Sequence, residues 1–245
     1  PYRHQEKAYE RLQPGSPQNT LVATGTGSGK TECFLLPVLE HCRQQLAIGQ
    51  KGIKAILIYP MNALATDQAN RIAQLVHDSP ELAGLRAGLY VGAKDDDPTI
   101  AMSAEGVITD KGALQKAPPD ILLTNYKQLD YLLIQPQVQG LWAHNTAGVL
   151  RYLVVDEFHT FDGAQGTDLA CLIRRLRDRL GCPGDELICV GTSATLGGPE
   201  KDSKVEILRY AGEIFASRFE PNALIEEDRI SLATFFQDNT DAGEE

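Results

Sequence analysis

The apolar residues of this chain gather in short continuous runs that alternate with longer amphipathic stretches. The runs lie at residues 21–23, 55–59, 86–91, 120–124, 150–155 and 187–191. Mostly apolar runs of this length, bounded by turn residues, predict strands that are buried on both faces. Helical periodicity is found between them, at residues 4–12, 31–48, 62–76, 125–134, 166–180 and 206–219. Strands that alternate with helices predict an α/β fold, in which a parallel sheet has helices on both faces.

Two parts of the chain have a weaker pattern. Residues 93–119 are small and polar, and predict a mobile connection with one helix near residues 112–116. From Glu220 onward acidic residues accumulate and the periodicity fades, so no further regular element is predicted there. We expect the predicted strands to form one domain, followed by a helix and an acidic tail.

A glycine-rich turn joins the first predicted strand to the helix that follows it. Its sequence is Thr24-Gly25-Thr26-Gly27-Ser28-Gly29-Lys30-Thr31. In such a turn successive backbone N–H groups can point at a phosphate, and the helix N-terminus adds its positive dipole end. Lys30 would reach the β- and γ-phosphates of a nucleotide, and the hydroxyl of Thr31 would hold Mg²⁺. The strict phosphate-loop pattern has a glycine where this chain has Thr24. The alternative is a flexible turn without a ligand.

An acidic pair follows the apolar run at residues 150–155. Asp156 and Glu157 stand where the strand ends, which is the edge at which open α/β sheets bind ligands. Asp156 would bind Mg²⁺, and Glu157 would orient or deprotonate the attacking water. The alternative is an exposed acidic pair that caps a helix. It is less favoured because a phosphate loop precedes the pair in the same chain. The two stretches together predict binding and hydrolysis of a nucleoside triphosphate.

The first predicted helix adds a candidate for base recognition. The side-chain amide of Gln5 can both donate to and accept from adenine, and Tyr2 or Arg3 could stack on or flank the same base. An ordinary surface glutamine is the alternative, and Gln5 taken alone favours that alternative.

Composition narrows the class of protein. The chain has 245 residues with 42% hydrophobic content, enough for one sizeable α/β core. It has no run of 18 apolar residues and no signal-peptide pattern, so we expect no membrane contact. The five cysteines show no zinc or C-x-x-C spacing, which favours buried thiols in the cytoplasm. Because it begins with Pro1, we expect the chain to be part of a longer protein.

The net charge of −10 is unevenly distributed. Residues 200–245 carry a net charge of −7, whereas residues 1–199 carry only −3. The body of the chain is therefore near neutral, and its charge neither supports nor excludes a nucleic-acid partner. The arginines of residues 174–179 are expected to form a solvated face near the C-terminus of their helix.

Six stretches in a fixed order carry a resemblance to a known family. They are residues 3–5, 24–31, 59–68, 124–126, 156–159 and 192–195. The series resembles the motifs of the first RecA-like domain of a superfamily 2 helicase, over residues 2–199. Residues 21–31 and 156–163 are similar to the Hrq1/MrfA/Lhr-like branch of DNA helicases. Residues 210–215 and 226–229 resemble large bacterial helicases of anti-phage defence islands, such as the Druantia helicase.

The resemblance implies roles for the matched positions. Gln5, with Arg3, matches the position that recognises adenine. The segments that grip the backbone of a nucleic-acid strand match Pro60, Met61, Asn62, Ala63, Gly92, Thr124, Asn125 and Tyr126. The positions that couple the ATP state to domain movement match His159, Ser193 and Thr195. Phe158 departs from the small residue that is commoner at its place.

The resemblance also implies a RecA-like P-loop domain over residues 1–199, with residues 200–245 leading toward a second RecA-like domain of the same parent chain. ATP and Mg²⁺ are the implied cofactors, and single-stranded DNA tracked by its backbone is the implied partner. The second domain would supply an arginine finger, so we expect slow hydrolysis by this part alone. The implied setting is bacterial defence or DNA repair, with defence-complex proteins as further partners.

Three alternatives to a DNA helicase remain open. They are an RNA helicase, a translocase that moves on duplex without separating the strands, and a non-catalytic ATP-dependent nucleic-acid-binding scaffold. The intact Lys30, Asp156 and Glu157 argue against the scaffold, because a protein that only binds has no chemical need for Glu157.

Overall fold

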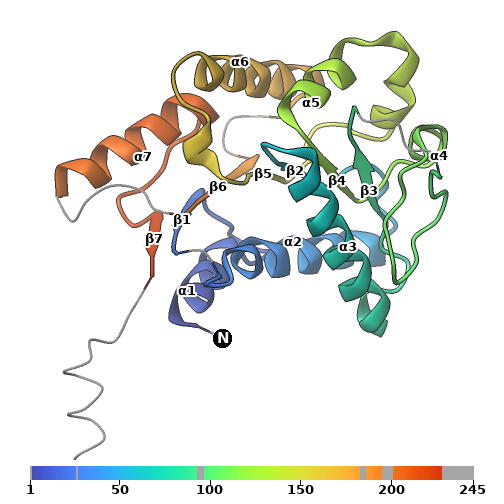
Figure 1. Cartoon of the computed structure of the whole chain (residues 1–245), viewed down its shortest axis with the longest axis horizontal. Coiled ribbons are helices and arrows are strands. Elements are labelled where there is room, and N and C mark those ends of the chain that lie inside the picture. The colour runs from blue at the N-terminus through green and yellow to red at the C-terminus, as the bar shows by residue number, and fades with distance from the viewer. Residues whose placement is uncertain (1, 26, 93–96, 183–185, 195–200, 228–245) are drawn as a thin grey trace, which may run out of the picture.

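A sheet of parallel strands forms the centre of the molecule (Figure 1). The computed structural model describes residues 2–25, 27–92, 97–182, 186–194 and 201–227. In these residues seven strands pair in the order β3-β4-β2-β5-β6-β1-β7. Their bounds are β1 Thr20–Ala23, β2 Ala55–Ile58, β3 Ala87–Tyr90, β4 Ile121–Thr124, β5 Tyr152–Val155, β6 Ile188–Ser193 and β7 Leu224–Glu226. Six of the seven correspond to the apolar runs in the sequence.

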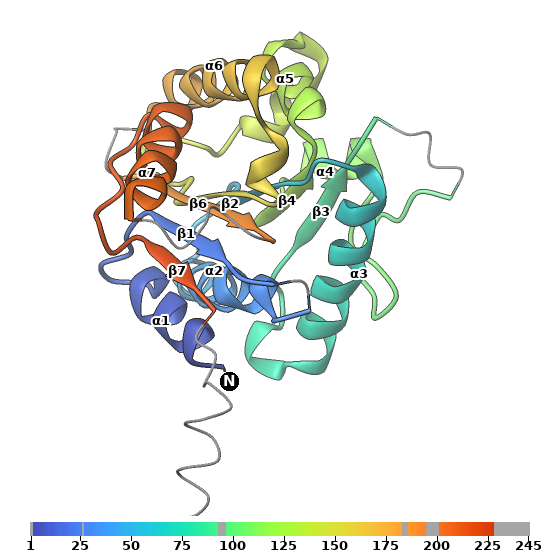
Figure 2. The ribbon, with the colours of Figure 1, turned by 60° about the vertical axis from the view of Figure 1, so that its left-hand side comes forward.

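Helices cover both faces of the sheet (Figures 1 and 2). One face carries α1 Arg3–Leu12, α2 Lys30–Ala47 and α3 Asn62–Asp78. The other carries α5 Tyr126–Ile134, α6 Gly163–Leu180 and α7 Lys201–Phe215. The short helix α4 Lys111–Lys116 packs Leu114 against Gly88 of β3. Three 3₁₀ turns complete the described elements, at Pro80–Leu82, Pro136–Trp142 and Phe158–Thr160.

The directions of its side chains explain why all the residues of β5 are apolar. Successive side chains of a strand point to opposite faces. Tyr152 and Val154 pack in the core shared with α1, α2 and α3, whereas Leu153 and Val155 pack in the core beneath α5, α6 and α7. All four are buried. The predicted α/β fold, with a parallel sheet covered on both faces, is confirmed.

The strand register brings the predicted motifs to one edge of the sheet. Val155 pairs with Ile58 on one side and with Gly191 on the other, and Ile58 also pairs with Thr124. On the far side of β6, Ser193 pairs with Ala23. Because all these strands are parallel, the segments that follow them leave the sheet at the same edge.

Several boundaries differ from the sequence-based prediction. The helix expected from residue 166 begins at Gly163, and β6 continues to Ser193. The largest difference is β7, which lies where no regular element was predicted. Its residues Leu224 and Ile225 pair with Leu21 and Val22 of β1. A strand this short has too few residues to show a period, and its pairing partner lies about two hundred residues earlier.

One arginine departs from the predicted solvated face of α6. Arg174, Arg175 and Arg179 are exposed, but Arg177 is only 8% exposed. Its Nη2 donates to the carbonyl oxygen of Phe215 over 3.2 Å, and also to the hydroxyl of Ser217. Arg177 therefore fastens the end of α7 to α6. The expectation was wrong here, because helical periodicity does not reveal which neighbour covers a given turn.

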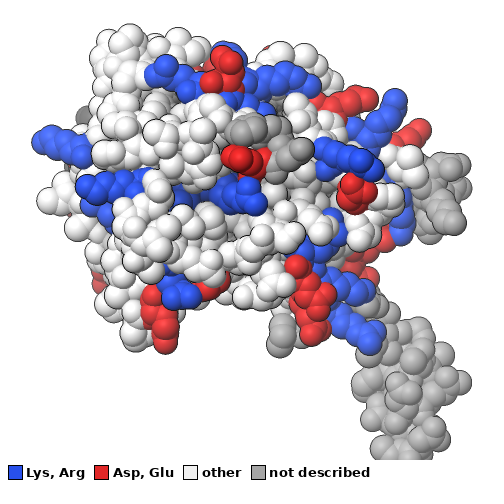
Figure 3. All heavy atoms as spheres, turned by 180° about the vertical axis from the view of Figure 1, so that it is seen from behind, with Lys and Arg blue, Asp and Glu red and all other residues white. Residues whose placement is uncertain are grey.

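Charged side chains of both signs mix on the face seen from behind in Figure 3. Lys54 and Asp120 are a buried exception, joined by an ion pair of 2.6 Å. The second Asp120 oxygen accepts a hydrogen bond from the backbone N–H of Arg86, so the pair fastens the beginnings of three strands. No helix in the described part of the chain is long and apolar enough to cross a membrane. Four cysteines are buried as expected, and Cys171 is exposed.

Candidate functional site

The glycine-rich turn after β1 folds around its own lysine. Lys30 is the first residue of α2, and its Nζ donates to the carbonyl oxygens of Thr24 and Gly25, over 3.1 and 3.4 Å. The Ser28 hydroxyl donates to the Thr24 hydroxyl over 2.7 Å. Gly27 and Gly29 have φ angles of +78° and +79°, which favour glycine. A Cβ on Gly29 would stand 2.2 Å from Nε2 of Gln5, so the Gln5 side chain would have to move to admit another residue there.

The N-terminal helix α1 is tied to this turn by two side chains. Gln5 Nε2 donates to the carbonyl oxygen of Gly29 over 3.1 Å, and its Oε1 accepts from the backbone N–H of Tyr2. His4, which is 2% exposed, places Nε2 2.9 Å from the carbonyl oxygen of Ser28. Tyr2 is exposed and stacks on the ring of His4, and Arg3 is exposed. The structure therefore brings the predicted base-binding residues beside the phosphate loop.

Glu227, the residue after β7, also contacts the phosphate loop. The backbone N–H of Gly25 donates to Oε2 of Glu227 over 3.2 Å. Sequence reasoning missed this contact, because it depends on the pairing of β7 with β1. Two predicted site residues, Thr26 of the loop and Thr195 after β6, lie outside the described residues.

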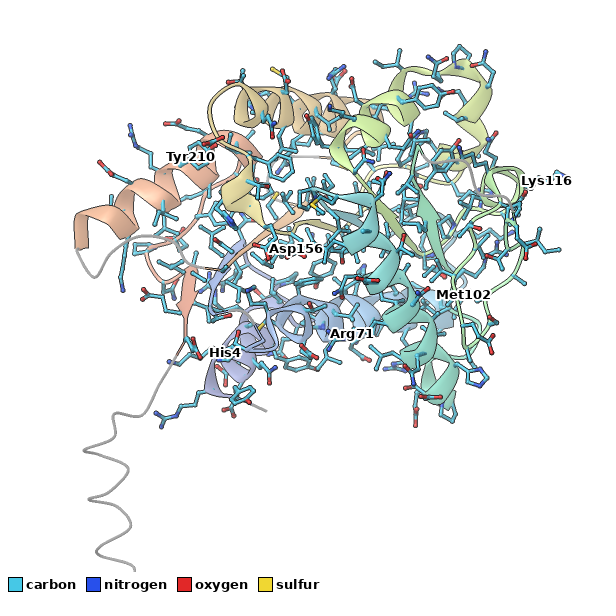
Figure 4. All side chains as sticks on the ribbon, in the orientation of Figure 1. His4, Arg71, Met102, Lys116, Asp156 and Tyr210 are labelled. Carbon is cyan, nitrogen blue, oxygen red and sulfur yellow. The ribbon has the colours of Figure 1, made fainter. Side chains whose placement is uncertain are left out.

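Asp156 lies at the end of β5, in the interior between the two helical layers (Figure 4). It is 8% exposed, and its Oδ1 accepts a hydrogen bond from the fully buried hydroxyl of Thr192 on β6. The same Thr192 oxygen accepts from the backbone N–H of Glu157 over 3.3 Å. Burial raises the pKa of the Asp156 carboxyl, the Thr192 hydrogen bond opposes that rise, and the neighbouring Glu157 charge adds to it. A bound cation would stabilise the ionised form of Asp156.

Glu157 adopts a backbone conformation that is rare for its residue type. Its φ is +49°, in the left-handed region, and the turn Phe158–Thr160 begins directly after it. One carboxylate oxygen, Oε2, has no hydrogen-bond partner and lies 3.4 Å from Nδ1 of His159. The same ring nitrogen lies 2.9 Å from the Ser193 hydroxyl. Backbone strain of this kind costs about 1–3 kcal/mol and gathers at functional sites.

Phe158 fills the core beneath the acidic pair. It is 1% exposed and stacks on Phe215 of α7, with ring centroids 5.2 Å apart. Tyr210 of the same helix lies 5.6 Å from the Phe158 ring, and its hydroxyl donates to the carbonyl oxygen of Phe161. The unusual aromatic residue at this position is therefore matched by an aromatic face on α7. Figure 4 shows Tyr210 on that helix.

A groove of about 470 Å³ lies at the same edge of the sheet, beside β2, β3 and β4. The Nδ2 group of Asn125 donates to Oδ1 of Asn62 over 2.7 Å and joins the two loops that line it. Both α3 and α5 begin here, at Asn62 and Tyr126, so two helix N-termini converge. The lining residues are Pro60, Asn62, Gly92, Asn125, Tyr126, Lys127, Gln128, Tyr131 and Gln165. Five of these were predicted nucleic-acid contacts.

The other predicted contacts take different positions. Met61 and Ala63 are exposed next to Asn62. Thr124 is fully buried, and its hydroxyl donates to the carbonyl oxygen of Tyr90 over 2.7 Å. Thr124 therefore fastens β4 to β3 beneath the groove and does not present its hydroxyl on the surface. Lys127, Gln128, Tyr131 and Gln165 were missed, because nothing in the local sequence shows that α5 and the start of α6 face this groove.

An ion pair links the two helices that begin at the phosphate loop and at the groove. Arg71 of α3 contacts the carboxylate of Glu32, two residues after Lys30 on α2. Figure 4 shows Arg71 between these helices. The ion pair thus connects α2, which begins at Lys30, with α3, which begins at Asn62.

Comparison with known proteins identifies the family. Residues 2–203 match the family described as DEAD/DEAH box helicase. The chain belongs to this family. The DEAD/DEAH box relatives include the Druantia protein DruE of Escherichia coli, which is 29% identical over 82% of this chain and 16% of its own length. The ATP-dependent helicase YprA of Bacillus subtilis is 28% identical over 82% of this chain and 23% of its own length.

A solved helicase structure has a similar fold. The crystal structure of the DUF1998 helicase MrfA bound to DNA matches with a TM-score of 0.68 and 26% identity, over 92% of this chain and 25% of that protein. The expected RecA-like fold is confirmed, and so are the expected resemblances to the Hrq1/MrfA/Lhr-like branch and to the Druantia helicase. The chain spans a quarter or less of the length of these relatives.

Thr192 and His4 belong to the site although sequence reasoning assigned neither of them a role. Thr192 precedes Ser193 in the motif at residues 192–195, and His4 precedes Gln5 in the motif at residues 3–5. Only the observed hydrogen bonds show that the Thr192 hydroxyl holds Asp156 and that the His4 ring contacts the phosphate loop. The roles of the individual residues in ligand binding stay predictions.

Proposed function

We propose that this chain is the first RecA-like motor domain of an ATP-dependent DNA helicase or translocase. One observation carries the proposal: the phosphate loop, the acidic pair and the groove all leave the same edge of one parallel sheet. Nucleotide hydrolysis and strand binding would then act on one rigid body. In this proposal residues 1–199 are the motor domain, and residues 200–245 lead toward a second RecA-like domain.

The phosphate loop would bind ATP through its backbone N–H groups. Lys30 would exchange its present bonds to loop carbonyls for the β- and γ-phosphates, since charged acceptors bind an ammonium group more strongly. Gln5, already fixed beside Gly29, would read the adenine edge with Tyr2 and Arg3. Gly25 to Ser28, with Thr26 among them, would surround the phosphates.

The residues present fit a magnesium ion. Asp156 is a buried carboxylate whose pKa is raised by burial, and such a group gains from a nearby cation. Thr31 follows Lys30 and would add a hydroxyl ligand. The described residues hold no group of three or more His, Cys, Asp or Glu side chains that could bind a metal alone. That agrees with Mg²⁺, which prefers one or two protein oxygens together with substrate phosphates and water. When bound, it would neutralise charge on the phosphates.

Glu157 would act on the attacking water. Its Oε2, buried and without a hydrogen-bond donor, would accept a proton from that water as the water oxygen bonds to the γ-phosphorus. The bond from the γ-phosphorus to the bridging oxygen of the β-phosphate would break, and ADP would leave. Thr192 holds the backbone of Glu157 and the carboxylate of Asp156 together, which fixes the position of one relative to the other. His159 and Ser193, joined by a hydrogen bond, would pass a change at Glu157 to the loop after β6.

The groove would hold the sugar–phosphate backbone of a nucleic-acid strand. The amide groups of Asn62 and Asn125 and the N-termini of α3 and α5 suit phosphates without reading sequence. The MrfA structure, in which a protein of the same family is bound to DNA, supports DNA as the strand. DruE, a Druantia protein, supports a role in bacterial defence, where further protein partners would join the parent chain.

Hydrolysis of ATP with and without single-stranded DNA tests this proposal. We expect the chain to bind ATP, to hydrolyse it slowly, and to do so faster with the strand. Glu157→Gln should keep ATP binding and reduce hydrolysis by roughly 100-fold or more, because it removes a general base. Glu105→Gln, an exposed carboxylate outside the site, is the matched control and should leave both unchanged.

Two further arms separate the rival functions. Stimulation by single-stranded RNA but not by DNA would replace the DNA motor with an RNA motor. ATP binding with no hydrolysis under any nucleic acid, from the longest parent protein, would replace it with a binding scaffold.

A further inference from the structure

We infer that Tyr131 stacks on an unpaired base of the strand that the groove holds. The inference rests on the proposed function and deepens it, because it assigns to the groove a contact with bases besides the contacts with phosphates. Tyr131 is a residue of α5, is 45% exposed, and lines the groove together with Asn62 and Asn125.

Exposure by itself decides nothing, since single exposed aromatic residues are common on protein surfaces. The position on α5 is what distinguishes Tyr131. Lys127 and Gln128 stand four and three residues before it, so the three side chains share one face of the helix, and all three line the groove. A cation, an amide and an aromatic ring thus follow one another away from the helix N-terminus.

This order matches the layout of a nucleotide. A phosphate held at the N-terminus of α5 would lie beside Tyr126, and Tyr131 stands about 7.5 Å further along the helix axis at 1.5 Å per residue. The base of a nucleotide extends away from its phosphate, so a base attached to that phosphate can reach the Tyr131 ring. Lys127 lies between the two and would meet the charged backbone.

Gly92, which follows β3, lines the groove directly beside α5. A Cβ on Gly92 would come within 3.1 Å of Oε1 of Gln128, so a residue with a side chain there would narrow the space. Gln165, from the first turn of α6, lines the groove as well. The absence of a side chain at Gly92 therefore leaves room beside Gln128, on the face of α5 that carries Tyr131.

Stacking on Tyr131 would select single strands. In a duplex each base face is covered by its neighbours, whereas an unpaired base can expose a face to an aromatic side chain. The contact would not depend on base identity, because every base has a π-face. It would be shared by DNA and RNA strands.

The test uses single-stranded oligonucleotides that carry the fluorescent base 2-aminopurine, with binding followed by anisotropy. We expect Tyr131→Ala to weaken binding about fivefold or more and to abolish the quenching of 2-aminopurine. Tyr131→Phe should restore both, because it keeps the ring. Tyr9→Ala is the matched control: Tyr9 is a 40% exposed tyrosine of α1 that does not line the groove.

An abasic strand provides the decisive comparison. The chain and its Tyr131→Ala variant should bind an abasic strand equally, since no base is present to stack. Unchanged affinity and unchanged quenching in Tyr131→Ala would overturn the inference, as would an affinity loss that the abasic strand shares.

Failure of this inference is distinguishable from failure of the proposed function. If Asn125→Asp weakens binding but Tyr131→Ala does not, base stacking is wrong and the phosphate groove stands. If the unaltered chain binds neither DNA nor RNA strands, both ideas are wrong. If Tyr131→Ala lost affinity for DNA strands but not for RNA strands, base stacking would also be excluded as the cause, because both kinds of strand carry bases that can stack.

Discussion

Asn125 donates a hydrogen bond to Asn62 over 2.7 Å and holds together the loops that follow β4 and β2. The same side chain caps α5, because its Oδ1 accepts from the backbone N–H of Gln128 over 2.8 Å. Asn125 therefore performs two tasks: it starts a helix and it fixes the spacing of the groove.

Substitution of Asn125 can separate these tasks. Asn125→Asp keeps the capping acceptor but removes the donor and adds a negative charge beside the predicted phosphate position. We expect it to keep its thermal stability and to lose roughly tenfold in affinity for single-stranded DNA, equivalent to about 1.4 kcal/mol. Asn125→Ala loses the cap as well and should also cost about 1 kcal/mol of stability. Equal affinity of Asn125→Asp and the unaltered chain would contradict the role of the pair.

Asp156→Asn should stabilise the unliganded chain while it abolishes hydrolysis. Burial raises the folded-state pKa of Asp156 above the unfolded value, so the ionised carboxylate weakens the fold at neutral pH. The substitution removes that charge and can keep the Thr192 hydrogen bond. We expect a gain of roughly 0.5–2 kcal/mol in urea unfolding at neutral pH. The gain should shrink as the pH falls through the raised pKa and vanish below the ordinary value of 3.8. A variant that is less stable at neutral pH would count against this account.

Thr192→Val tests the hydroxyl that joins Asp156 to Glu157. The change leaves a buried Asp156 oxygen without its donor, which should reduce the free energy of unfolding by about 1–3 kcal/mol. It should also slow hydrolysis, because the backbone of Glu157 loses its contact with Thr192. Thr192→Ser keeps the hydroxyl and serves as the control. If Val and Ser behave alike, the hydroxyl does not matter.

Phe158→Ala should loosen α7. The substitution removes a fully buried ring that stacks on Phe215, and truncation of a buried phenylalanine costs about 3–5 kcal/mol. Hydrogen exchange should rise in α7 more than in α2, which packs on the other face of the sheet. Phe158→Leu keeps most of the apolar volume and should show a smaller effect. Equal exchange in both helices would argue against a local role.

His41 should make the fold sensitive to mild acid. Burial, followed by the charges of Arg151 and Lys54, lowers its pKa from 6.5 to about 4. The unfolded chain therefore takes up a proton at His41 before the folded chain does. His41 therefore contributes up to roughly 3 kcal/mol to the free energy of unfolding. This contribution is complete above pH 6.5 and is lost as the pH falls from 6.5 to about 4. His41→Gln should flatten the pH dependence of urea unfolding over that interval, and an unchanged slope would contradict it.

Much of the fold and of the nucleotide site could be predicted because both depend on local sequence. Strands such as β5 are continuous apolar runs, and Gly27 and Gly29 are required by the backbone of the turn itself. Asp156 and Glu157 stand directly after one predicted strand, and Lys30 follows another after the glycine-rich turn. The parallel arrangement of those strands therefore brings all three residues to one edge. The groove was predicted in part, through Asn62 and Asn125.

The remaining features depend on residues that meet from distant parts of the chain. Thr124 faces Tyr90 and not the groove, which follows from the neighbour that β3 provides. Arg177 is buried because the end of α7 covers it. Periodicity predicts neither of these contacts. A local pattern indicates which residues share a face of an element, but it does not indicate which other element packs on that face.

The sequence by itself determined the alternation of strands and helices, the phosphate loop and the acidic pair, because each is a property of a few consecutive residues. Only the tertiary structure decided that β7 completes the sheet and brings Glu227 to Gly25, and that Tyr131 lies in the groove with Asn62. The physical reason is the same in each case. Pairing and packing between segments far apart in sequence depend on the whole core. The sequence of a short segment does not specify which distant segment it contacts.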